Sequence, residues 1–443
     1  MVDHNQFQNL NYQAHWMPFS ANRNFQQDPR IIVAAKDAHL IDQQGRKVYD
    51  SLSGLWTCGL GHCVQEIQQA VSHQLATLDY SPAFQFAHPL SFQLAEQITA
   101  LLPDPLNHVF FTDSGSESAD TAIKIAKAYW RIRGQANKTK IIGRARGYHG
   151  VNIGGSSVGG IGGNRKMFGP LMDADHIPHT LQPNMAFTKG MAEQGGIALA
   201  DEMLKVIELH DASNIAALIV EPVSGSAGAL IPPQSYLKRL REICDQHNIL
   251  LIFDEVITGF GRLGRYSAAE YFSVTPDLLC FAKQISNGAI PLGGVVVSSQ
   301  IYDTFMQQDL AAHAVEFSHG YTYSAHPVAC AAGLATLRVM AEQDIVQQAD
   351  ALSSDFEQLI HQLKDSKHVI DIRNCGLIGA VQLQARDGDP TIRPFEVGMR
   401  LWQAGFYVRF GGDTLQFGPM FNSRRNDLNN LFCAVDEHLS HIA

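Results

Sequence analysis

Two apolar, strand-like runs of the sequence end in residues that could do chemistry. Leu278–Ala282 is followed by Lys283, and Ile249–Phe253 is followed by Asp254. A lysine in an apolar setting has a lowered pKa and becomes a usable amine nucleophile. A buried carboxylate needs a positive group nearby, because burying it alone costs free energy. Lys283 follows Asp254 by about one helical crossover, so the two side chains can occupy neighbouring strand ends.

A third strand-like run, Phe110–Thr112, leads through Asp113 into Ser114-Gly115-Ser116 and then directly into a helical pattern. Small residues allow close approach of the backbone, and the unpaired amides at the start of a helix bind an anion such as phosphate. The segment is therefore a candidate anion site.

Each feature alone has an ordinary structural interpretation. A serine-rich helix start is usually only a cap, a carboxylate after a strand can cap a helix or lie in solvent, and a single lysine there is usually a surface residue. Together, an anion site, a carboxylate that keeps a pyridinium nitrogen protonated and a lysine that forms a Schiff base are what a protein must supply for pyridoxal phosphate. Their coincidence indicates this cofactor.

The segments that carry these residues alternate between short β-rich runs and longer helical ones from about residue 62 to 300. Such alternation predicts right-handed βαβ units and a mostly parallel sheet with helices on both faces. Ligands of such sheets bind beyond the carboxyl ends of the strands, where the three candidate segments stand. The Gly-rich run 154–163 is predicted to be a mobile loop, because it has neither a following GK[ST] nor a GxGxxG after a strand.

The two ends of the chain have another pattern. Residues 38–55 predict a small hairpin with a turn at Gly45. A long helical stretch after about 326 leads to the strand-like pieces GLIGAVQL, GFYVRF and TLQFGP and to a final amphipathic helix. We expect an α/β fold with a large domain at 62–325 and a smaller α+β domain built from residues 1–61 and 326–443.

The composition excludes several classes of protein. Of 443 residues, 45% are hydrophobic and 17% are charged, and the net charge is -10. No Lys/Arg-rich run stands out, so nucleic acid is not an expected partner. No apolar stretch has the roughly 18 residues that span a bilayer, and the first residues lack the pattern of a signal peptide. Seven scattered cysteines suit reduced thiols, so we expect a cytoplasmic protein with no membrane partner.

Two other kinds of site find little support. The sequence has nineteen histidines but no HExxH, and the pairs His176/His179 and His438/His441 lack a recognisable set of further ligands. We therefore expect no metal site. No GxSxG elbow indicates a hydrolase.

At this point the sequence resembles the class III aminotransferases, which are pyridoxal-phosphate enzymes of fold type I. The resemblance runs from His15–Phe19 to Gly405–Gly418, and its signature is IFDEVITGFGRLG around Asp254 with the dipeptide AK that ends at Lys283. It is strongest to the β-alanine (ω-amino acid):pyruvate branch. The resemblance implies a large domain with a mostly parallel sheet of the seven-stranded type.

The resemblance also implies roles for residues around the cofactor. Lys283 would form the imine with the cofactor and act as base and acid of the proton shift, and Asp254 would pair with the pyridinium nitrogen. Tyr148, in RGYHG, matches the residue that stacks on the ring, and Val256 would lie against the other face.

The phosphate would be bound from two subunits. Gly115 and Ser116 would bind it through backbone and hydroxyl groups, and Thr322, in HGYTYSAHP, would reach it from a second subunit. The active site would then lie at the interface of a homodimer or homotetramer.

Four residues match the substrate pocket of the family. Arg409 matches the arginine that grips the substrate carboxylate. Trp56 resembles part of the aromatic lining, as do Tyr148 and Phe86, the last contributed by the loop Phe84–Phe86 across the interface. Without the matching motifs, a solvated arginine and ordinary core packing of the aromatic residues would be the better interpretations.

The sequence departs from the family pattern at two positions. Ornithine and γ-aminobutyrate transaminases have a glutamate after the EP dipeptide that pairs with the arginine, but this chain has Ser226 there. Arg409 should then stay available for carboxylates, which favours pyruvate as acceptor. Asp113 stands where the family commonly has Asn, and a carboxylate near a phosphate site would weaken binding unless it points away or caps the helix.

The sequence therefore predicts a transaminase that moves the amino group of an ω-amino acid such as β-alanine to pyruvate with ping-pong kinetics. An amine or taurine:pyruvate transaminase is the alternative within the family. An isomerase or racemase of the same fold would need no separate keto acid. A non-catalytic regulator that binds the cofactor is disfavoured by the intact set of Lys283, Asp254 and Arg409.

Overall fold

The computed structural model describes residues 10–168 and 172–443, and its central element is a seven-stranded sheet. The strand order is β4-β10-β9-β8-β7-β5-β6. These strands are β4 (Leu106–Thr112), β10 (Gly293–Ser298), β9 (Leu278–Phe281), β8 (Leu250–Asp254), β7 (Ile215–Val220), β5 (Lys140–Arg144) and β6 (Ala174–Ile177). Pairs from β6 to β9 are parallel, whereas β10 runs antiparallel to both β9 and β4. The predicted mostly parallel sheet is confirmed.

The central strands are apolar throughout because both faces of the sheet are covered. Every residue of β7 and β8 is buried. In β8, Leu251 and Phe253 belong to the core that includes helices α7 and α8, whereas Leu250 and Ile252 belong to the core beneath α5 and α10. Strands buried on both faces are nearly continuous hydrophobic runs, which is why these segments could be recognised in the sequence.

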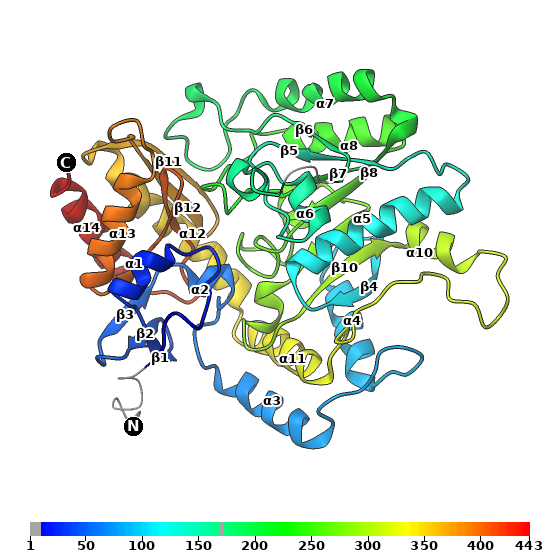
Figure 1. Ribbon diagram of the computed structural model, residues 1–443, viewed down its shortest axis with the longest axis horizontal. Helices are drawn as coiled ribbons and strands as arrows, with labels where there is room; N and C mark the ends of the chain where they lie inside the picture. Colours follow the sequence, from blue (N-terminus) through cyan, green and yellow to red (C-terminus); the bar gives the residue numbers. More distant parts are fainter. Residues whose placement is uncertain (1–9, 169–171) are drawn as a thin grey trace.

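The sheet is covered by helices on both faces (Figure 1). Helix α8 has its buried residues at helical spacing, Tyr236, Leu237, Leu240, Ile243 and Cys244, so one stripe faces the core. The helices of this part of the chain are α3 (Gln65–Thr77), α4 (Pro89–Ala100), α5 (Gly115–Ile132), α6 (Ile153–Val158), α7 (Gly196–His210), α8 (Tyr236–Gln246), α9 (Ala268–Phe272), α10 (Ser299–Met306) and α11 (Pro327–Glu342).

The two ends of the chain lie together at one side of the large sheet, blue beside orange and red in Figure 1. Strand β13 (Phe406–Tyr407) runs parallel to β3 in the sheet β1-β2-β3-β13, so a strand from each end shares one sheet. A second sheet has the order β11-β12-β15-β14. The remaining elements are β1 (Ile32–Lys36), β2 (His39–Asp42), β3 (Lys47–Asp50), β11 (Val369–Cys375), β12 (Ile378–Leu383), β14 (Arg409–Gly411), β15 (Thr414–Phe417), α1 (Asn22–Gln27), α2 (Ser53–Trp56), α12 (Ile345–His361), α13 (Ile392–Gln403) and α14 (Arg425–Ser440).

The predicted hairpin within 38–55 is confirmed for its strands. β2 and β3 pair antiparallel around the turn at Gly45, whereas the residues after Asp50 form a turn and the short helix α2. The piece GFYVRF is divided between β13 and β14, which belong to different sheets. The first nine residues of the predicted segment 1–61 lie outside the described residues.

The prediction of a mobile loop at 154–163 is wrong for its first half, which lies in α6. The glycines there permit close packing rather than mobility. A Cβ at Gly155 would collide with the carbonyl oxygen of His149, and one at Gly154 would lie 2.5 Å from the Asp120 carboxylate. The amide of Gly155 donates to that carboxylate at 2.8 Å, which ties α6 to α5.

Within the described residues, no helix has both the length and the apolar character to cross a bilayer. All seven cysteines are free thiols.

Candidate active site

The three chemically unusual strand ends meet at one edge of the large sheet. β8 ends at Asp254, β9 leads through Ala282 to Lys283, and β4 leads through a short turn to Gly115 at the start of α5. They enclose a cavity of about 130 Å³, lined by Gly115, Ser116, Tyr148, Gly150, Glu221, Asp254, Val256, Ile257 and Lys283. The structure thus brings together six residues predicted for the cofactor site; the seventh, Thr322, lies elsewhere.

Lys283 is held in an uncommon backbone conformation. It begins the 3₁₀ turn Lys283–Ser286 with a φ of 53°, in the left-handed region. Burial lowers the pKa of its amine to about 8, against the opposing effect of the carboxylates of Asp254 and Glu221. The amine is therefore uncharged in a substantial fraction of molecules near neutral to mildly basic pH, as a nucleophile requires.

Asp254 is paired with His149, a residue that the sequence interpretation missed. The Nδ1 atom of His149 lies 2.8 Å from Oδ2 of Asp254, and the amide of Val256 donates to Oδ1 at 3.2 Å. Both side chains are buried. His149 follows Tyr148 in the motif that resembles the family, and that neighbour was the signal that could have identified it.

Glu221 is the second residue that the sequence interpretation missed. It follows β7 directly, is fully buried, and accepts hydrogen bonds from the amides of Tyr148 at 2.9 Å and Gly225 at 3.3 Å. Burial raises the pKa of its carboxyl, and the nearby Asp254 adds to the rise. Its position after a parallel strand, at the same edge as Asp254, could have identified it.

The start of α5 forms the candidate anion site. Ser114 caps the helix by accepting the amide of Glu117 at 3.2 Å, and the Ser116 hydroxyl accepts the amide of Val151 at 3.1 Å. A Cβ at Gly115 would lie 2.9 Å from Val256, so only glycine leaves this corner of the cavity open. The N-terminal amides of a helix favour an anion.

A larger cavity of about 660 Å³ adjoins the first and shares Lys283 and Tyr148 with it. Trp56, Ser226 and Arg409 line it. The Arg409 guanidinium carbon lies 5.6 Å from the centroid of the Trp56 ring, and the Nε of Arg409 is buried without a hydrogen-bond partner in the part of the chain that the structure describes.

Thr322 and Phe86 lie outside both cavities and are exposed. Their two segments contact each other: the Tyr80 hydroxyl donates to the carbonyl of Thr322 at 3.0 Å, and Phe84 packs against Gly320. Phe86 and Phe84 are 68% and 56% exposed. One chain alone therefore does not bring these two predicted residues to its own site.

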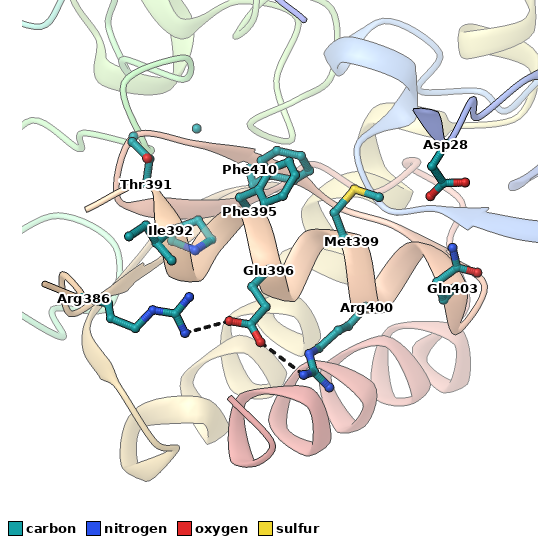
Figure 2. A pocket seen from close by; sticks show the side chains of 13 residues that line it. Asp28, Arg386, Thr391, Ile392, Phe395, Glu396, Met399, Arg400, Gln403 and Phe410 are labelled. Carbon is teal, nitrogen blue, oxygen red and sulfur yellow. Dashed lines mark hydrogen bonds and ion pairs between the residues drawn. The ribbon is translucent and has the colours of Figure 1, made fainter. Parts of the chain in front are cut away.

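A third cavity, of about 780 Å³, lies against α13 and contains none of the predicted residues (Figure 2). Three of its charged side chains are paired with one another, since Arg386 and Arg400 both contact Glu396, at 2.8 and 3.1 Å. No group of three or more His, Cys, Asp or Glu residues suited to a metal ion occurs among residues 10–168 and 172–443.

The residues of the first cavity fit pyridoxal phosphate. A helix N-terminus with glycines at the points of closest approach suits a phosphate, a buried carboxylate suits a protonated ring nitrogen, and a lysine with a lowered pKa suits an aldehyde. The second cavity supplies the Arg409 guanidinium, whose Nε has no partner among the described residues, for a substrate with a carboxylate.

Comparison with known proteins agrees with this geometry. The family model for class-III aminotransferases matches residues 20–439. A β-alanine–pyruvate aminotransferase of Pseudomonas aeruginosa is 72% identical over 98% of this chain and 97% of its own length. An ω-amino acid–pyruvate aminotransferase of Pseudomonas putida is 66% identical over 97% of this chain and 96% of its own length.

A solved structure extends the agreement to the fold. The crystal structure of an amine transaminase from an uncultivated Pseudomonas species, in its pyridoxal-phosphate-bound form, matches with a TM-score of 0.90 and 32% identity, over 97% of this chain and 99% of that chain. The family that the signature around Asp254 indicated is thereby confirmed. This chain belongs to the class-III aminotransferases, enzymes that depend on pyridoxal phosphate.

Proposed function

We propose that this aminotransferase moves the amino group of an ω-amino acid such as β-alanine to pyruvate, giving the semialdehyde and L-alanine. The observation that carries the proposal is the position of Arg409, whose Nε is unpartnered within the described residues and which shares a cavity with Lys283. Both substrates carry a carboxylate: in pyruvate it is bonded to the reacting carbonyl carbon, and in an ω-amino acid such as β-alanine it is separated from the amino-bearing carbon. A guanidinium binds such a carboxylate with two parallel hydrogen bonds. Two relatives are named for this pair of substrates.

The residues of the first cavity would hold the cofactor. Pyridoxal phosphate, when bound, supplies an aldehyde that captures amines and a ring that withdraws electrons. Gly115 and Ser116 would bind its phosphate at the start of α5, and Tyr148 and Val256 would line the space for its ring. Asp254 would keep the ring nitrogen protonated, because a nearby carboxylate favours the cationic form.

Lys283 would be the catalytic acid and base. The Nζ atom of Lys283 accepts the proton that leaves the amino-bearing carbon of the donor, and in the second half-reaction it donates a proton to the carbonyl carbon of the acceptor. A pKa of about 8 suits both directions of transfer, since the group is close to half protonated at mildly basic pH.

The second cavity would bind the substrate. Arg409 binds the carboxylate, and Trp56 packs against the guanidinium and the carbon chain. Ser226 leaves the guanidinium free, whereas a glutamate there would pair with it. The cavity can therefore accept donor and acceptor in turn through the same carboxylate contact, which is compatible with ping-pong exchange.

A second subunit would complete the site, in a homodimer or homotetramer. Thr322 contributes to phosphate binding, and the loop with Phe84 and Phe86 contributes to the substrate pocket of the partner. This proposal is supported by the contact between their two segments and by the exposure of the two phenylalanines, which are costly to leave in water.

Two organisational features belong to the same proposal. The division into residues 1–61, 62–325 and 326–443 is supported by the pairing of β3 with β13, which joins the first and last segments. A cytoplasmic location is supported by the seven free thiols.

The substrates can be tested through the absorbance of the bound cofactor. β-Alanine should shift the absorbance band of the loaded enzyme, and pyruvate should return it with release of alanine. Borohydride treatment followed by peptide mass spectrometry should place the cofactor on Lys283; attachment elsewhere, or none, would refute the assigned role.

A donor panel with pyruvate as acceptor separates the alternatives. Preference for taurine or a plain amine over β-alanine would favour the amine or taurine:pyruvate reaction. Arg409→Gln should raise KM for β-alanine at least about 30-fold, a loss of about 2 kcal/mol, and leave plain amines nearly unaffected. Turnover without any keto acid would indicate an isomerase, and absence of turnover with every donor would indicate a binding protein.

A further inference from the structure

The loop that carries Trp56 is held in an unfavourable backbone conformation. Ser53, Gly54 and Trp56 have φ values of 50°, 67° and 57°, in the left-handed region that residues other than glycine seldom adopt. Such conformations persist only where surrounding contacts fix them. Trp56 is 3% exposed, and its indole Nε1 is buried without a hydrogen-bond partner among the described residues. No hydrogen bond of the indole nitrogen therefore holds the ring: its place is set by the loop backbone, by apolar packing and by the Arg409 guanidinium beside the ring.

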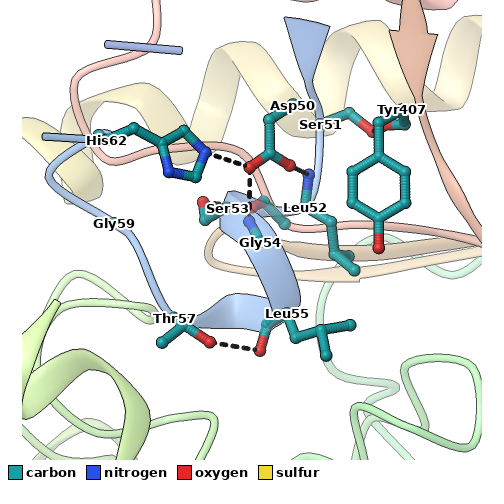
Figure 3. A network of polar contacts seen from close by, with 12 residues as sticks. Asp50, Ser51, Leu52, Ser53, Gly54, Leu55, Thr57, Gly59, His62 and Tyr407 are labelled. Atoms are coloured by element: carbon teal, nitrogen blue, oxygen red, sulfur yellow. Dashed lines mark hydrogen bonds and ion pairs between the residues drawn. The ribbon is translucent and has the colours of Figure 1, made fainter. Parts of the chain in front are cut away.

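Asp50 provides the contacts that fix this loop (Figure 3). Its carboxylate is fully buried and accepts the amide of Leu52 at 3.0 Å, the amide of Gly54 at 2.5 Å and the Nε2 of His62 at 2.9 Å. Two more hydrogen bonds fasten the loop from outside: Ser51 donates to the Tyr407 carbonyl at 2.5 Å and Ser53 to the Gly418 carbonyl at 2.8 Å.

His62 balances the charge of Asp50. Burial opposes protonation of the imidazole, but hydrogen bonds to Asp50 and Cys58 outweigh burial and raise the pKa of His62 to about 10. The buried Arg262 is a second cation that interacts with Asp50. A carboxylate this deeply buried needs such a partner, because an unpaired buried charge is strongly destabilising.

The other side of the same segment is tied to the turn that begins at Lys283. The amide of Gly59 donates to Oε1 of Gln284 at 2.7 Å, and the amide of Leu60 donates to Oδ1 of Asn287 at 3.0 Å. Asn287 in turn donates to the carbonyl of Gly61 at 2.9 Å. The contact between Asp50 and His62 thus closes the chain between them into a loop. Just before His62, Gly59 attaches this loop to Gln284, the residue that follows Lys283.

We propose that Asp50 and His62 are positioning residues that set the place of the Trp56 indole relative to Lys283 and so determine which amino donors the enzyme accepts. The inference rests on the proposed function, since it takes the cavity lined by Trp56, Lys283 and Arg409 as the donor site. Neither residue lines that cavity, so both act through the loop. The hydrogen bond between His62 and Asp50 holds the loop against its own conformational preference, and loss of this hydrogen bond lets Trp56 move.

Substitutions of His62 can separate the effect of the position of the hydrogen-bond donor from the effect of side-chain size. Gln places its amide nitrogen close to the Nε2 position of histidine, whereas Asn places it near Nδ1 and Ala removes the donor. We expect His62→Ala and His62→Asn to change the ratio of kcat/KM for β-alanine and for a bulkier donor, such as 1-phenylethylamine, at least fivefold. We expect the donor ratio of His62→Gln to stay within twofold of the donor ratio of the unsubstituted enzyme.

A matched control comes from His210, whose Nε2 lies 2.6 Å from the Asp175 carboxylate. Neither residue lines one of the two cavities. His210→Ala and His210→Gln should leave the donor ratio unchanged, even where they lower the melting temperature. Gly54→Ala is a second probe that leaves the ion pair intact. Its Cβ would have ordinary contact with Cys58, 3.5 Å away, but the residue would be strained at a φ of 67°, so the donor ratio should change in this variant too.

The proposal would be overturned if His62→Ala and Gly54→Ala lowered only the melting temperature and the amount of active enzyme, with the donor ratio within twofold. If His62→Ala failed to fold, the comparison of His62→Gln, His62→Asn and Gly54→Ala would decide in the same way. Failure of the proposed function would give a different result, because the unsubstituted enzyme would not accept β-alanine. The role of Asp50 and His62 would then be tested with the ratio of kcat/KM for two donors that the enzyme does accept.

Discussion

The imidazole of His149 and the carboxylate of Asp254 form a buried pair in which Nδ1 and Oδ2 are 2.8 Å apart. With the Val256 amide on the other oxygen, the carboxylate is fixed on both sides at the end of β8. A group held by two partners presents its remaining lone pairs in a constant direction, which is how a supporting residue sharpens a binding site.

Removal of the His149 imidazole should weaken the hold on the cofactor. In His149→Phe the carboxylate loses a partner, so we expect cofactor affinity to fall about tenfold, or about 1.4 kcal/mol, and kcat to fall at least as much. Asn can place a donor near the Nδ1 position, so His149→Asn should keep most of the affinity. Titration of the apoprotein followed by absorbance measures both, and equal losses in the two variants would contradict the assigned role.

The lowered pKa of Lys283 should be visible in the apoprotein. Only the neutral amine attacks an aldehyde, so the rate of covalent cofactor capture should rise about tenfold per pH unit below pH 8 and level off above it. Stopped-flow absorbance over pH 6 to 10 gives the profile. A midpoint near the ordinary lysine value of 10.5 would show that burial does not tune this amine.

Asp113 should oppose both folding and cofactor binding at higher pH. Burial and the nearby Glu117 raise the pKa of its carboxyl from 3.8 to about 6. The folded chain thus holds the proton more tightly than the unfolded chain, so this contribution to stability is lost as the pH rises from about 4 to 6. At pH 4, Asp113→Asn should be no more stable than the unsubstituted protein. Above pH 6 its melting temperature should be about 2–4 °C higher, which is the shift that roughly 1 kcal/mol causes in a domain smaller than this chain.

The Asp113→Asn variant also tests whether the Asp113 carboxylate repels the phosphate of the cofactor. Asp113 does not line the cavity, and Ser114 rather than Asp113 caps α5. We therefore expect Asp113→Asn to tighten cofactor binding less than tenfold at pH 8 and hardly at pH 5. A large effect at both values would mean that charge is not the cause.

A glutamate at position 226 should compete with substrates for Arg409. Ser226 and Arg409 line the same cavity, so Ser226→Glu should raise KM for pyruvate about 10- to 100-fold. Ser226→Gln is the matched control for size, and it should raise KM much less. Unchanged pyruvate turnover in Ser226→Glu would refute the link between this position and acceptor choice.

The fold and the pair Asp254 and Lys283 could be predicted from the residues because buried parallel strands leave a plain signal. The apolar runs that end at Asp254 and before Lys283 are strands β8 and β9, and the rule that ligands lie beyond strand ends brought both residues to one cavity. The same rule applied to β7 points to Glu221, which the interpretation passed over. The antiparallel direction of β10 left no signal, since its buried residues look the same in either direction.

Other features depend on contacts between distant segments and could not be read locally. The short helix α6 forms in a glycine-rich stretch because the glycines allow it to pack on the backbone near His149. The contacts that fix the loop of Trp56 depend on Asp50 and His62. Nothing in the sequence distinguishes this aspartate and this histidine until the loop between them closes. Pairs of this kind become recognisable only in three dimensions.

The pairing of β3 with β13 has a consequence for synthesis of the chain. Ser51 contacts Tyr407, 356 positions later, so at 5 to 20 residues per second the amino-terminal strands wait on the ribosome for roughly 20 to 70 s before their partner is made. During that interval β3 is an open edge, the kind of surface that recruits foreign strands. Chains truncated before β13 should therefore be captured by chaperones or aggregate, and the enzyme should tolerate losses at its carboxyl end poorly.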